Sequence, residues 1–415
     1  MTDFYDSLEQ RDPAQREAAL LQALPLQITH AQTHTPAWRQ ILQGVDAASV
    51  NSRSALAKLP VTRKYELLAR QQEQRAKNVF GGFSALNFGK LMPRVFASPG
   101  PIYEPEGVAK DYWRMARALF AAGFRSGELI HNCFSYHFTP AGSMMESGAH
   151  ALGCSVFPAG TGQTEQQLQA LLELRPSGYS GTPSFLKILL EKAAESQIAL
   201  PFLSKALVSG EAFPPSLRDW LGQRGVTAYQ CYATADIGLI AFETAAREGL
   251  VLDEGVIVEI VRPGSGDPVA EGEVGELVVT TLNPDYPLIR FGTGDLTAVL
   301  PGMCPTGRTN QRIKGWMGRA DQTTKVRGMF VHPGQVDQVV KRFPEVLKAR
   351  LVVSGEMADD QMHLHVETTQ ASDSLQAALA QAVRDVTKLR SEVVFVAPGS
   401  LDNDGLVIAD ARSYK

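Results

Sequence analysis

The sequence predicts an α/β protein with a large N-terminal domain, built of mainly parallel sheets plus an antiparallel subdomain, and a small α+β C-terminal domain. Short β-rich runs alternate with amphipathic helix patterns between residues 90 and 300. The composition changes after Gly315-Trp316-Met317-Gly318. We therefore expect a helical lead-in over residues 1–60, a first domain over 61–320 and a C-terminal domain over 321–415.

The first 60 residues are rich in Gln and Ala at helical spacing and end at Leu59-Pro60-Val61-Thr62, where a proline and a capping hydroxyl mark a new start. Strand-like runs then occur at 129–134 and 154–157, each bounded by glycine, proline or serine. Strand, helix and strand at this spacing indicate a mainly parallel sheet. Helices are expected where apolar residues share one face: Val108, Tyr112, Met115 and Leu119, and then Leu168, Leu171 and Leu172.

Two later regions have other patterns. The runs Val256–Val261 and Leu277–Thr281 are separated by the turn-rich segment 263–268, which indicates an antiparallel subdomain. The C-terminal region has apolar runs at 351–353, 363–366 and 393–396, with a helix between the last two whose apolar face holds Leu375, Leu379, Val383 and Val386. Its outline is therefore β-β-α-β.

Composition excludes several classes of protein. The chain has 415 residues, 44% hydrophobic and 20% charged, which is enough apolar material for more than one core. Its 40 basic and 44 acidic residues give a net charge of -4, so neither nucleic acid nor an anionic membrane is an expected partner. An acidic opening segment and the lack of a long apolar run predict no signal peptide and no membrane span, so a cytoplasmic location is expected.

The sequence gives no indication of a zinc site, of disulfides or of two common catalytic motifs. Single cysteines at 133, 154, 231 and 304 lack the spacing of a zinc site or a disulfide scaffold, so free thiols are expected. The histidines at 131, 137 and 150 also lack the spacing of a zinc triad. Neither a G-x-S-x-G elbow nor a G-x-x-x-x-G-K-[ST] loop occurs, which gives no support for a serine hydrolase or a P-loop NTPase.

Four turns are candidates for ligand contact. Ala97–Pro101 and Ser209–Pro214 follow apolar runs, and loops after parallel strands are where open α/β sheets bind ligands. Asp295, after the glycine-spaced run from Arg290, can hold a ribose diol with two acceptor oxygens; a turn-capping aspartate is the alternative. Asp236 could hold a magnesium ion that bridges phosphates, or it could cap a helix.

Read together, eight motifs resemble those of the phenylacetate–CoA ligase branch of the adenylate-forming enzymes, and the likeness runs from about residue 55 to about 412. In order they are Leu59–Lys64, Ala97–Gly100, Gly160–Glu165, Gly181–Ser184, Gly210–Pro214, Tyr232–Asp236, Pro287–Asp295 and Gly318–Asp321.

The resemblance implies a large adenylation domain and a small mobile C-terminal domain, joined at a hinge that matches Asp321. Such enzymes are AMP-forming acid–thiol ligases: they activate a carboxylic acid with Mg-ATP to an acyl-adenylate, and coenzyme A then displaces AMP. The implied partners are coenzyme A and a small acid, which aromatic pocket walls suggest is an aryl or arylacetic acid. A homodimer is possible.

The resemblance also implies roles for individual residues. Asp295 would bind the ribose hydroxyls, helped by Arg319, and Asp236 stands where the family has a magnesium-binding glutamate. Further nucleotide contacts would come from Ser98, Gly100, Gly210, Glu211, Ala212, Tyr232 and Thr234. The acyl pocket would be lined by Tyr136, Phe138, Gly181, Thr182 and Pro183, and Lys325, Arg327 and Gly328 would turn toward the site for thioester formation.

The departures from the family pattern all concern phosphate chemistry. The family loop Ser-Ser-Gly-Thr-Thr-Gly-Lys-Pro is replaced by Ser98–Pro105, whose three prolines remove amide donors and whose Glu104 is expected to bring negative charge toward a polyphosphate. Ala235 replaces a serine or threonine, and Asp236 is one methylene shorter than glutamate. The closing Gly-Lys of the family corresponds to Gly405-Leu406, so the adenylation lysine has no match.

Two hypotheses follow. The first is an AMP-forming acyl-CoA ligase, which the retained Asp295, Arg319 and Asp321 favour. The second is a non-catalytic relative that binds a nucleotide, acyl-CoA or acid and acts as a sensor or partner protein, which the rewritten phosphate loop and Leu406 favour.

Overall fold

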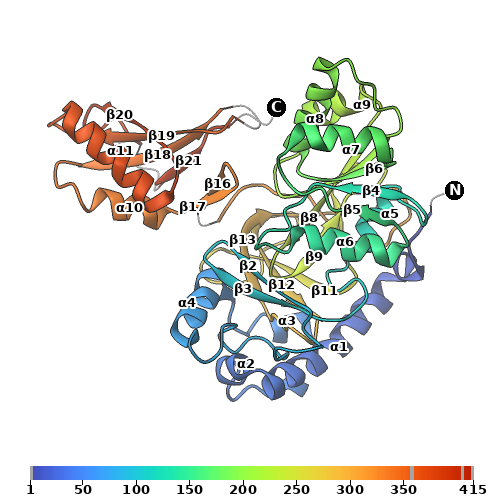
Figure 1. The fold of residues 1–415 in the computed structure, drawn as a ribbon. Coiled ribbons are helices and arrows are strands. Elements are labelled where there is room, and N and C mark those ends of the chain that lie inside the picture. The colour runs from blue at the N-terminus through green and yellow to red at the C-terminus, as the bar shows by residue number, and fades with distance from the viewer. Residues whose placement is uncertain (1–2, 321, 356–358, 403–405, 413–415) are drawn as a thin grey trace. The chain divides into compact units, whose positions relative to one another are not determined.

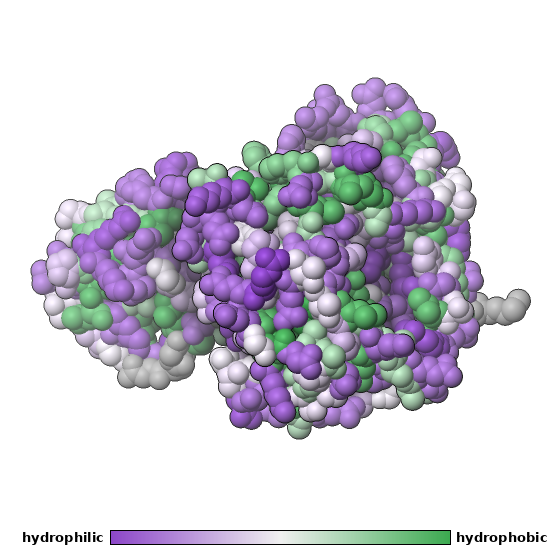
Figure 2. Space-filling view, turned by 90° about the horizontal axis from the view of Figure 1, so that it is seen from below, coloured by the Kyte–Doolittle hydropathy of each residue, from purple (hydrophilic) through white to green (hydrophobic). Residues whose placement is uncertain are grey.

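The computed structural model describes residues 3–320, 322–355, 359–402 and 406–412. The chain divides into two compact units, Met1–Met317 and Gly318–Lys415 (Figure 1). Parallel and antiparallel sheets with covering helices are present, which confirms the predicted α/β class. Among the described helices, none is both long and apolar enough to cross a bilayer. Figure 2 shows polar and apolar residues interspersed over the face it presents.

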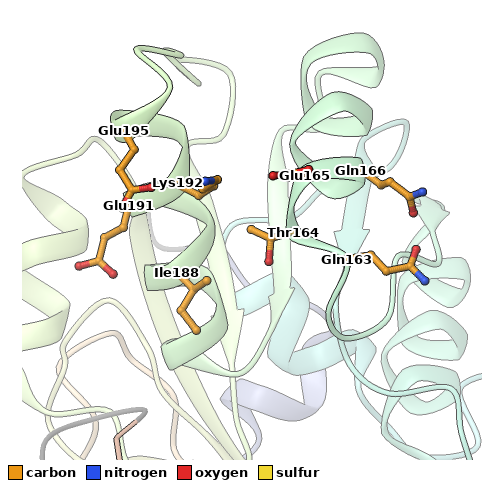
Figure 3. A pocket seen from close by; sticks show the side chains of 8 residues that line it. All are labelled: Gln163, Thr164, Glu165, Gln166, Ile188, Glu191, Lys192 and Glu195. Atoms are coloured by element: carbon orange, nitrogen blue, oxygen red, sulfur yellow. Dashed lines mark ion pairs between the residues drawn. The ribbon is translucent and has the colours of Figure 1, made fainter.

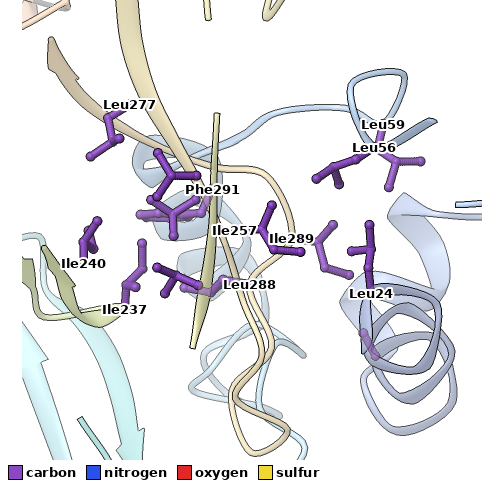
Figure 4. Close-up of a cluster of buried hydrophobic side chains, with 14 of the residues drawn as sticks. Leu24, Leu56, Leu59, Ile237, Ile240, Ile257, Leu277, Leu288, Ile289 and Phe291 are labelled. Carbon is purple, nitrogen blue, oxygen red and sulfur yellow. The ribbon is translucent and has the colours of Figure 1, made fainter. Parts of the chain in front are cut away.

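The N-terminal segment is helical, as predicted. Its main elements are α1 (Pro13–His34), α2 (Pro36–Ile41) and α3 (Arg53–Leu56). Helix α1 begins where Asp12 accepts hydrogen bonds from the amides of residues 14 and 15, with a proline at its first turn. Leu24 on α1 and Leu56 on α3 are buried in one core with Ile257 and Ile289 (Figure 4). The lead-in therefore packs into the first unit.

A nine-stranded sheet forms the centre of the first unit, in the order β14-β15-β10-β9-β8-β7-β6-β4-β5. The strands from β5 to β8 pair in parallel, and helices α6 (Ala141–Leu152), α7 (Thr164–Leu174), α8 (Pro183–Glu195) and α9 (Pro215–Gly222) connect them. This part of the sheet is parallel, as predicted, whereas the strands from β8 through β9, β10 and β15 to β14 pair antiparallel, so the sheet as a whole is mixed. The strands are β4 (Leu129–Asn132), β5 (Ser155–Phe157), β6 (Gly178–Gly181), β7 (Lys205–Val208), β8 (Thr227–Thr234), β9 (Gly238–Phe242), β10 (Leu250–Leu252), β14 (Val299–Leu300) and β15 (Arg312–Ile313).

The expected antiparallel pair belongs to a second sheet. Strand β11 (Val256–Val261) pairs antiparallel with β12 (Gly275–Thr281), as predicted, and β12 pairs with β13 (Phe291–Thr297). The short β1 (Thr62–Arg63) completes this sheet by pairing in parallel with β13. Asp295 lies in the half-buried part of β13, between Gly294 and Leu296.

Arg290 ties this sheet to the N-terminal segment. It is 2% exposed, and its Nε donates to Glu259 at 3.0 Å. The other guanidinium N–H groups donate to the carbonyl oxygens of Ala57 (2.8 Å), Leu59 and Gly266 (2.7 Å). Although Arg290 opens the motif that ends at Asp295, its contacts here are structural.

We expect Arg290→Met to lower the free energy of unfolding by about 3–5 kcal/mol, because Glu259 would keep a buried charge without its partner. Urea denaturation measures this change. Lys341→Met is the control, since Lys341 belongs to an exposed ion pair with Asp337, and its loss should cost about 1 kcal/mol or less. Equal losses for the two variants would contradict the structural role of Arg290.

The turn Ala97–Pro101 does not follow a parallel strand, so the prediction of its position at the end of such a strand was wrong. It joins β2 (Arg94–Ser98) to β3 (Ile102–Glu106) in an antiparallel two-stranded hairpin. The reason is local, since the Pro-Gly-Pro turn is short and the flanking runs pair with each other.

Only the second half of one expected helix forms. The prediction had placed Val108, Tyr112, Met115 and Leu119 on its apolar face. Helix α5 spans Ala116–Ala121. Before it, Asp111 and Arg114 have φ values of 54° and 63°, which an α-helix cannot contain. The Asp111 carboxylate accepts hydrogen bonds from the amides of Met115 (2.7 Å) and Ala116 (3.0 Å), so it stops the helix from extending toward residue 108.

The predicted apolar face of α7 is also narrower than expected. Leu168 and Leu171 are buried, whereas Leu172 is 41% exposed. Gln167 takes the buried position beside them, because its amide donates to the carbonyl oxygens of Gly160 (3.0 Å) and Gly162 (2.7 Å).

The C-terminal unit contains the predicted β-β-α-β outline within a larger set of elements. Its four-stranded sheet has the order β20-β19-β18-β21, with β18 and β19 antiparallel. Its core is formed by apolar residues of this sheet and of helices α10 and α11. The elements are β16 (Thr324–Val326), β17 (Met329–Val331), α10 (Pro333–Val340), β18 (Lys348–Ser354), β19 (Gln361–Glu367), α11 (Asp373–Thr387), β20 (Glu392–Val396) and β21 (Ile408–Asp410).

Candidate active site

Four neighbouring parallel strands end at one edge of the large sheet, and most of the predicted site residues follow them. Tyr136 and Phe138 come after β4, Thr182 and Pro183 after β6, and the segment 210–212 after β7. Asp236 comes after β8, which pairs in parallel with β7. The carboxyl ends of parallel strands share one edge, and this edge is the usual ligand-binding side of an open α/β sheet.

Asp295, on β13 of the second sheet, contacts Tyr232 on β8 of the large sheet. The hydroxyl of Tyr232, on β8, donates to Oδ2 of Asp295, on β13, at 2.5 Å. The indole N–H of Trp316 donates to Oδ1 at 3.1 Å. Both carboxylate oxygens therefore point to hydrogen-bond donors, which is the arrangement that two vicinal hydroxyls of a ribose would need. A turn-capping role does not account for these two contacts from distant residues.

Trp316 holds the Asp295 oxygen that a ribose hydroxyl would use, and it is 45% exposed. We expect AMP to displace its indole and change the intrinsic fluorescence, and Trp316→Phe to remove that change. A hydrogen bond to a charged group is worth about 1.5–3 kcal/mol, so loss of this competing bond should tighten AMP binding about tenfold or more. Trp220→Phe is the control, because Trp220 contacts Arg224 and Lys187 instead. A fluorescence change that survives Trp316→Phe would contradict the displacement.

The hairpin that replaces the family's phosphate loop is stabilised by hydrogen bonds between its own residues. The carboxyl group of Glu104, which is 0% exposed, accepts a hydrogen bond from the Ser98 amide at 3.1 Å and another from the Ser98 hydroxyl. Burial, and then the nearby charge of Asp236, raises the pKa of Glu104 to about 8. Burial and the charge of Asp236 thus favour the protonated form of Glu104 over the negative charge that the sequence suggested.

Asp236 lies in the turn between β8 and β9, so the helix-cap alternative is wrong. Its side chain is 1% exposed, and Oδ2 accepts a hydrogen bond from Nζ of Lys64 at 2.8 Å. Oδ1 is buried and has no hydrogen-bond partner among the described residues. The Thr234 hydroxyl oxygen accepts a hydrogen bond from the amide of Ile237 at 3.2 Å, which stabilises the same turn.

Asp236 would offer a magnesium ion one oxygen, Oδ1, because the ammonium group of Lys64 holds Oδ2. Magnesium is usually held by one or two carboxylates, with substrate phosphates and water completing its six oxygen ligands, so this single oxygen fits such an ion. Among the described residues, no group of three or more His, Cys, Asp or Glu side chains is arranged to hold a metal. The four cysteines are buried and free, as expected.

The segment predicted to line the adenine is held on both sides. Glu211 accepts a hydrogen bond from the Ser184 hydroxyl at 2.5 Å, which links the loop after β7 to the start of α8. Ser209 donates to the carbonyl oxygen of Cys231 on β8 at 2.8 Å. Gly210 has a φ of 83°, a conformation that favours glycine.

The predicted acyl-pocket residues differ in how firmly they are held. Tyr136 donates its hydroxyl proton to Glu146 at 2.8 Å and accepts from Asn132 at 2.8 Å. Gly181 lies against Tyr179, whose hydroxyl would be 2.2 Å from an added Cβ, so a side chain does not fit there. Phe138 is 80% exposed, so it forms no closed wall in this structure.

The C-terminal candidates Lys325 and Arg327 lie in the second unit. The backbone N–H of Arg327 donates to Oδ2 of Asp360 at 2.8 Å, and its guanidinium donates to the Asp360 carbonyl oxygen. Lys325 lies on β16, and Leu406 is 40% exposed. Asp321, the predicted hinge, lies outside the described residues. The Leu406 carbonyl oxygen accepts a hydrogen bond from Arg350, a contact that the sequence did not suggest.

A hollow of about 620 Å³ lies between α7 and α8 (Figure 3). Its lining includes Glu165, Glu191, Glu195 and Lys192, and it contains none of the residues predicted to bind nucleotide or acid. It is therefore separate from the candidate site.

Comparisons with known proteins agree with this geometry. A family model described as AMP-binding enzyme matches residues 109–283, and one described as AMP-binding enzyme C-terminal domain matches 328–406. Phenylacetate-coenzyme A ligase of Thermus thermophilus is 31% identical over 361 residues, which are 83% of this chain and 79% of that protein. The enzyme of the same name from Escherichia coli K12 is 28% identical over 424 residues, covering 95% and 94%.

A crystal structure of 2-hydroxyisobutyryl-CoA ligase with 2-HIB-AMP and CoA matches with a TM-score of 0.81 at 24% identity, over 98% of this chain and 92% of that one, which confirms the fold. The chain thus belongs to the AMP-binding, adenylate-forming enzymes. Within them it falls with the phenylacetate–CoA ligases, as its motifs indicated.

Proposed function

We propose that this protein is an AMP-forming acid–CoA ligase that acts on an aryl or arylacetic acid. The observation that carries the proposal is that Tyr232 and Trp316 both donate hydrogen bonds to Asp295. Tyr232 lies on β8, one of the parallel strands that most of the predicted nucleotide and acyl residues follow. Relatives at 28–31% identity that are named phenylacetate-coenzyme A ligases support the class of reaction.

In the proposed first step, the acid's carboxylate oxygen attacks the α-phosphorus of ATP and pyrophosphate leaves. Asp295 would orient the ribose by accepting from its hydroxyls, and the loop around Gly210 would contact the adenine. In the second step, the thiol of coenzyme A loses its proton to solvent, its sulfur attacks the acyl carbon, and AMP leaves with the electrons of the C–O bond. Orienting both reactants in one site is the main contribution expected of these residues.

Tyr136, Thr182 and Pro183 would contact the acyl group, since they follow β4 and β6 at the same edge. Lys325 and Arg327 are proposed to serve the thioester step. A small carboxylic acid and coenzyme A are the proposed partners, in the cytoplasm, with a homodimer possible.

A second candidate is a binding protein without adenylation activity. The self-closed Ser98–Glu104 hairpin and the exposed Leu406 favour it, because neither supplies the phosphate contacts that the family uses.

Pyrophosphate exchange with a panel of aryl, arylacetic and short-chain acids separates the two, run beside AMP and ATP binding by calorimetry. A ligase should exchange pyrophosphate with at least one acid. AMP binding without exchange for any acid would favour the binding protein, and the absence of both would contradict the adenosine site itself.

A further inference from the structure

The Tyr136 side chain, which would line the acyl pocket, is held by groups on two elements. Its hydroxyl accepts a hydrogen bond from the Asn132 amide on β4 at 2.8 Å and donates to Oε2 of Glu146 on α6 at 2.8 Å. Its ring lies against Gly142, where an added Cβ would be 2.8 Å from Cδ2 of the ring. Gly142 and Glu146 are four residues apart and share one face of α6. Tyr136 therefore lies along this face, from the ring at Gly142 to the hydroxyl at Glu146.

The direction of the two hydrogen bonds follows from the surroundings of Asn132. Asn132 is fully buried; its amide nitrogen also donates to the carbonyl oxygen of Gly142 at 2.9 Å, and its side-chain oxygen accepts from the Ser180 hydroxyl at 2.9 Å. The amide nitrogen thus faces Tyr136, which must accept from it and has its own proton left for Glu146. Burial, and then the hydrogen bond to Glu146, raises the pKa of Tyr136, so the phenol keeps the proton that it donates.

The hairpin of β2 and β3 contacts the same arrangement. Nη2 of Arg94, on β2, lies 4.0 Å from Oε1 of Glu146, the oxygen other than the one that Tyr136 contacts. The backbone N–H of Ala97 donates to the carbonyl oxygen of Phe138 at 2.8 Å. The hairpin therefore supports both the segment after β4 and the carboxylate that holds Tyr136.

We propose that Glu146 is a positioning residue for the acid: by accepting the hydroxyl proton of Tyr136, it holds the ring in the orientation that the acyl group would contact. The inference rests on the proposed function, in which Tyr136 contacts the acid. Glu146 belongs to none of the motifs that indicated the family. Without this acceptor the ring can adopt other rotamers, and the acid would have to immobilise it on binding.

The test compares two ligands by calorimetry on the full chain. They are AMP and phenylacetyl sulfamoyl adenosine, in which a sulfamate replaces the phosphate of phenylacetyl-adenylate. Because both contain adenosine, a change in the ratio of their affinities between variants reports on the acyl group. Glu146→Met removes the acceptor, Tyr136→Phe removes the hydroxyl, and a double variant removes both. Glu146→Gln keeps an oxygen that can accept.

Glu128→Met is the matched control. Glu128 is ion-paired to Lys205 at 2.7 Å, and its side chain is 23% exposed, against 22% for Glu146. It precedes β4, so it lies at the opposite end of the strand from Tyr136. Loss of this ion pair tests whether removal of any partly exposed carboxylate near β4 has the same effect.

We expect Glu146→Met to bind the acyl ligand about three- to tenfold more weakly and AMP with wild-type affinity, because only the acyl ligand has to order the ring. Tyr136→Phe should show the same selective loss, and the double variant should lose no more than either single variant, since all three remove one contact. Glu146→Gln and Glu128→Met should bind both ligands as the wild type does. A wild-type ratio in folded Glu146→Met, or losses that multiply in the double variant, would overturn the proposal.

If Glu146→Met does not fold, Tyr136→Phe decides the question, because it removes the hydroxyl that Glu146 holds. A selective loss of the acyl ligand supports the proposal, and a wild-type ratio overturns it. A failure of the proposed function differs, since the wild type itself would then bind the acyl ligand no more tightly than AMP, or bind neither, and this inference would fall with it. A failure of the inference alone leaves the tight binding of the acyl ligand by the wild type intact.

Discussion

Asp295→Ala is expected to weaken AMP binding by about 10²-fold or more. Hydrogen bonds to charged groups contribute about 1.5–3 kcal/mol each, and the variant removes both acceptor oxygens that a ribose diol would use. In the structure these oxygens accept from Tyr232 and Trp316, so the site for two donors already exists. Calorimetric titration with AMP measures the loss.

Asp337→Ala is the control for this prediction, because it removes an exposed carboxylate on α10 that pairs with Lys341. Circular dichroism should show that both variants are folded. Wild-type affinity for AMP in a folded Asp295→Ala would remove the ribose assignment and, with it, the main support for the adenosine site.

Leu406→Lys is expected to raise the rate of pyrophosphate exchange. The matched family position carries a lysine, and removing one preorganised charge of this kind typically costs about 10²–10³ in rate. Leu406 is 40% exposed just before β21, so a lysine there can extend into solvent without disrupting the core of the unit. Initial exchange rates with the best acid of the panel measure the gain.

Val394→Lys is the matched control for the added charge, since Val394 is 38% exposed on β20 of the same unit. We expect it to leave the exchange rate unchanged. If Leu406→Lys gave no more activity than Val394→Lys, the adenylation step would have to rest on other groups than the family's arrangement suggests.

The sequence predicted the fold where periodicity and burial agree. The run Val256–Val261 is a strand with the predicted bounds, since every residue in it is apolar or buried in the sheet. The helix expected from residue 108 failed because the Asp111 carboxylate and two positive φ values stop it, and neither is visible as an apolar pattern. The hairpin at Ser98–Ile102 was missed for a related reason, since strand pairing depends on partners that periodicity does not identify.

The candidate site was predictable only in part. Asp295 and Tyr232 were each expected to contact nucleotide, but their contact joins residues 63 positions apart on two different sheets. Lys64 belonged to a predicted motif but had no predicted role of its own. It is 172 residues from Asp236 in the sequence, and nothing at that separation indicates their ion pair. Trp316 had no predicted role, and it lies in the segment after which the composition changes. Such long-range pairs depend on how the sheets meet, and a single sequence does not reveal that.

The most direct test of the account is the complete reaction, with phenylacetate, ATP and coenzyme A supplied to the wild-type protein and the products identified by mass spectrometry. The account predicts acyl-CoA and AMP in equal amounts from at least one aryl or arylacetic acid, and faster thioester formation when the acyl-adenylate is supplied ready-made. No acyl-CoA from any acid of the panel, nor from the ready-made adenylate, would contradict it.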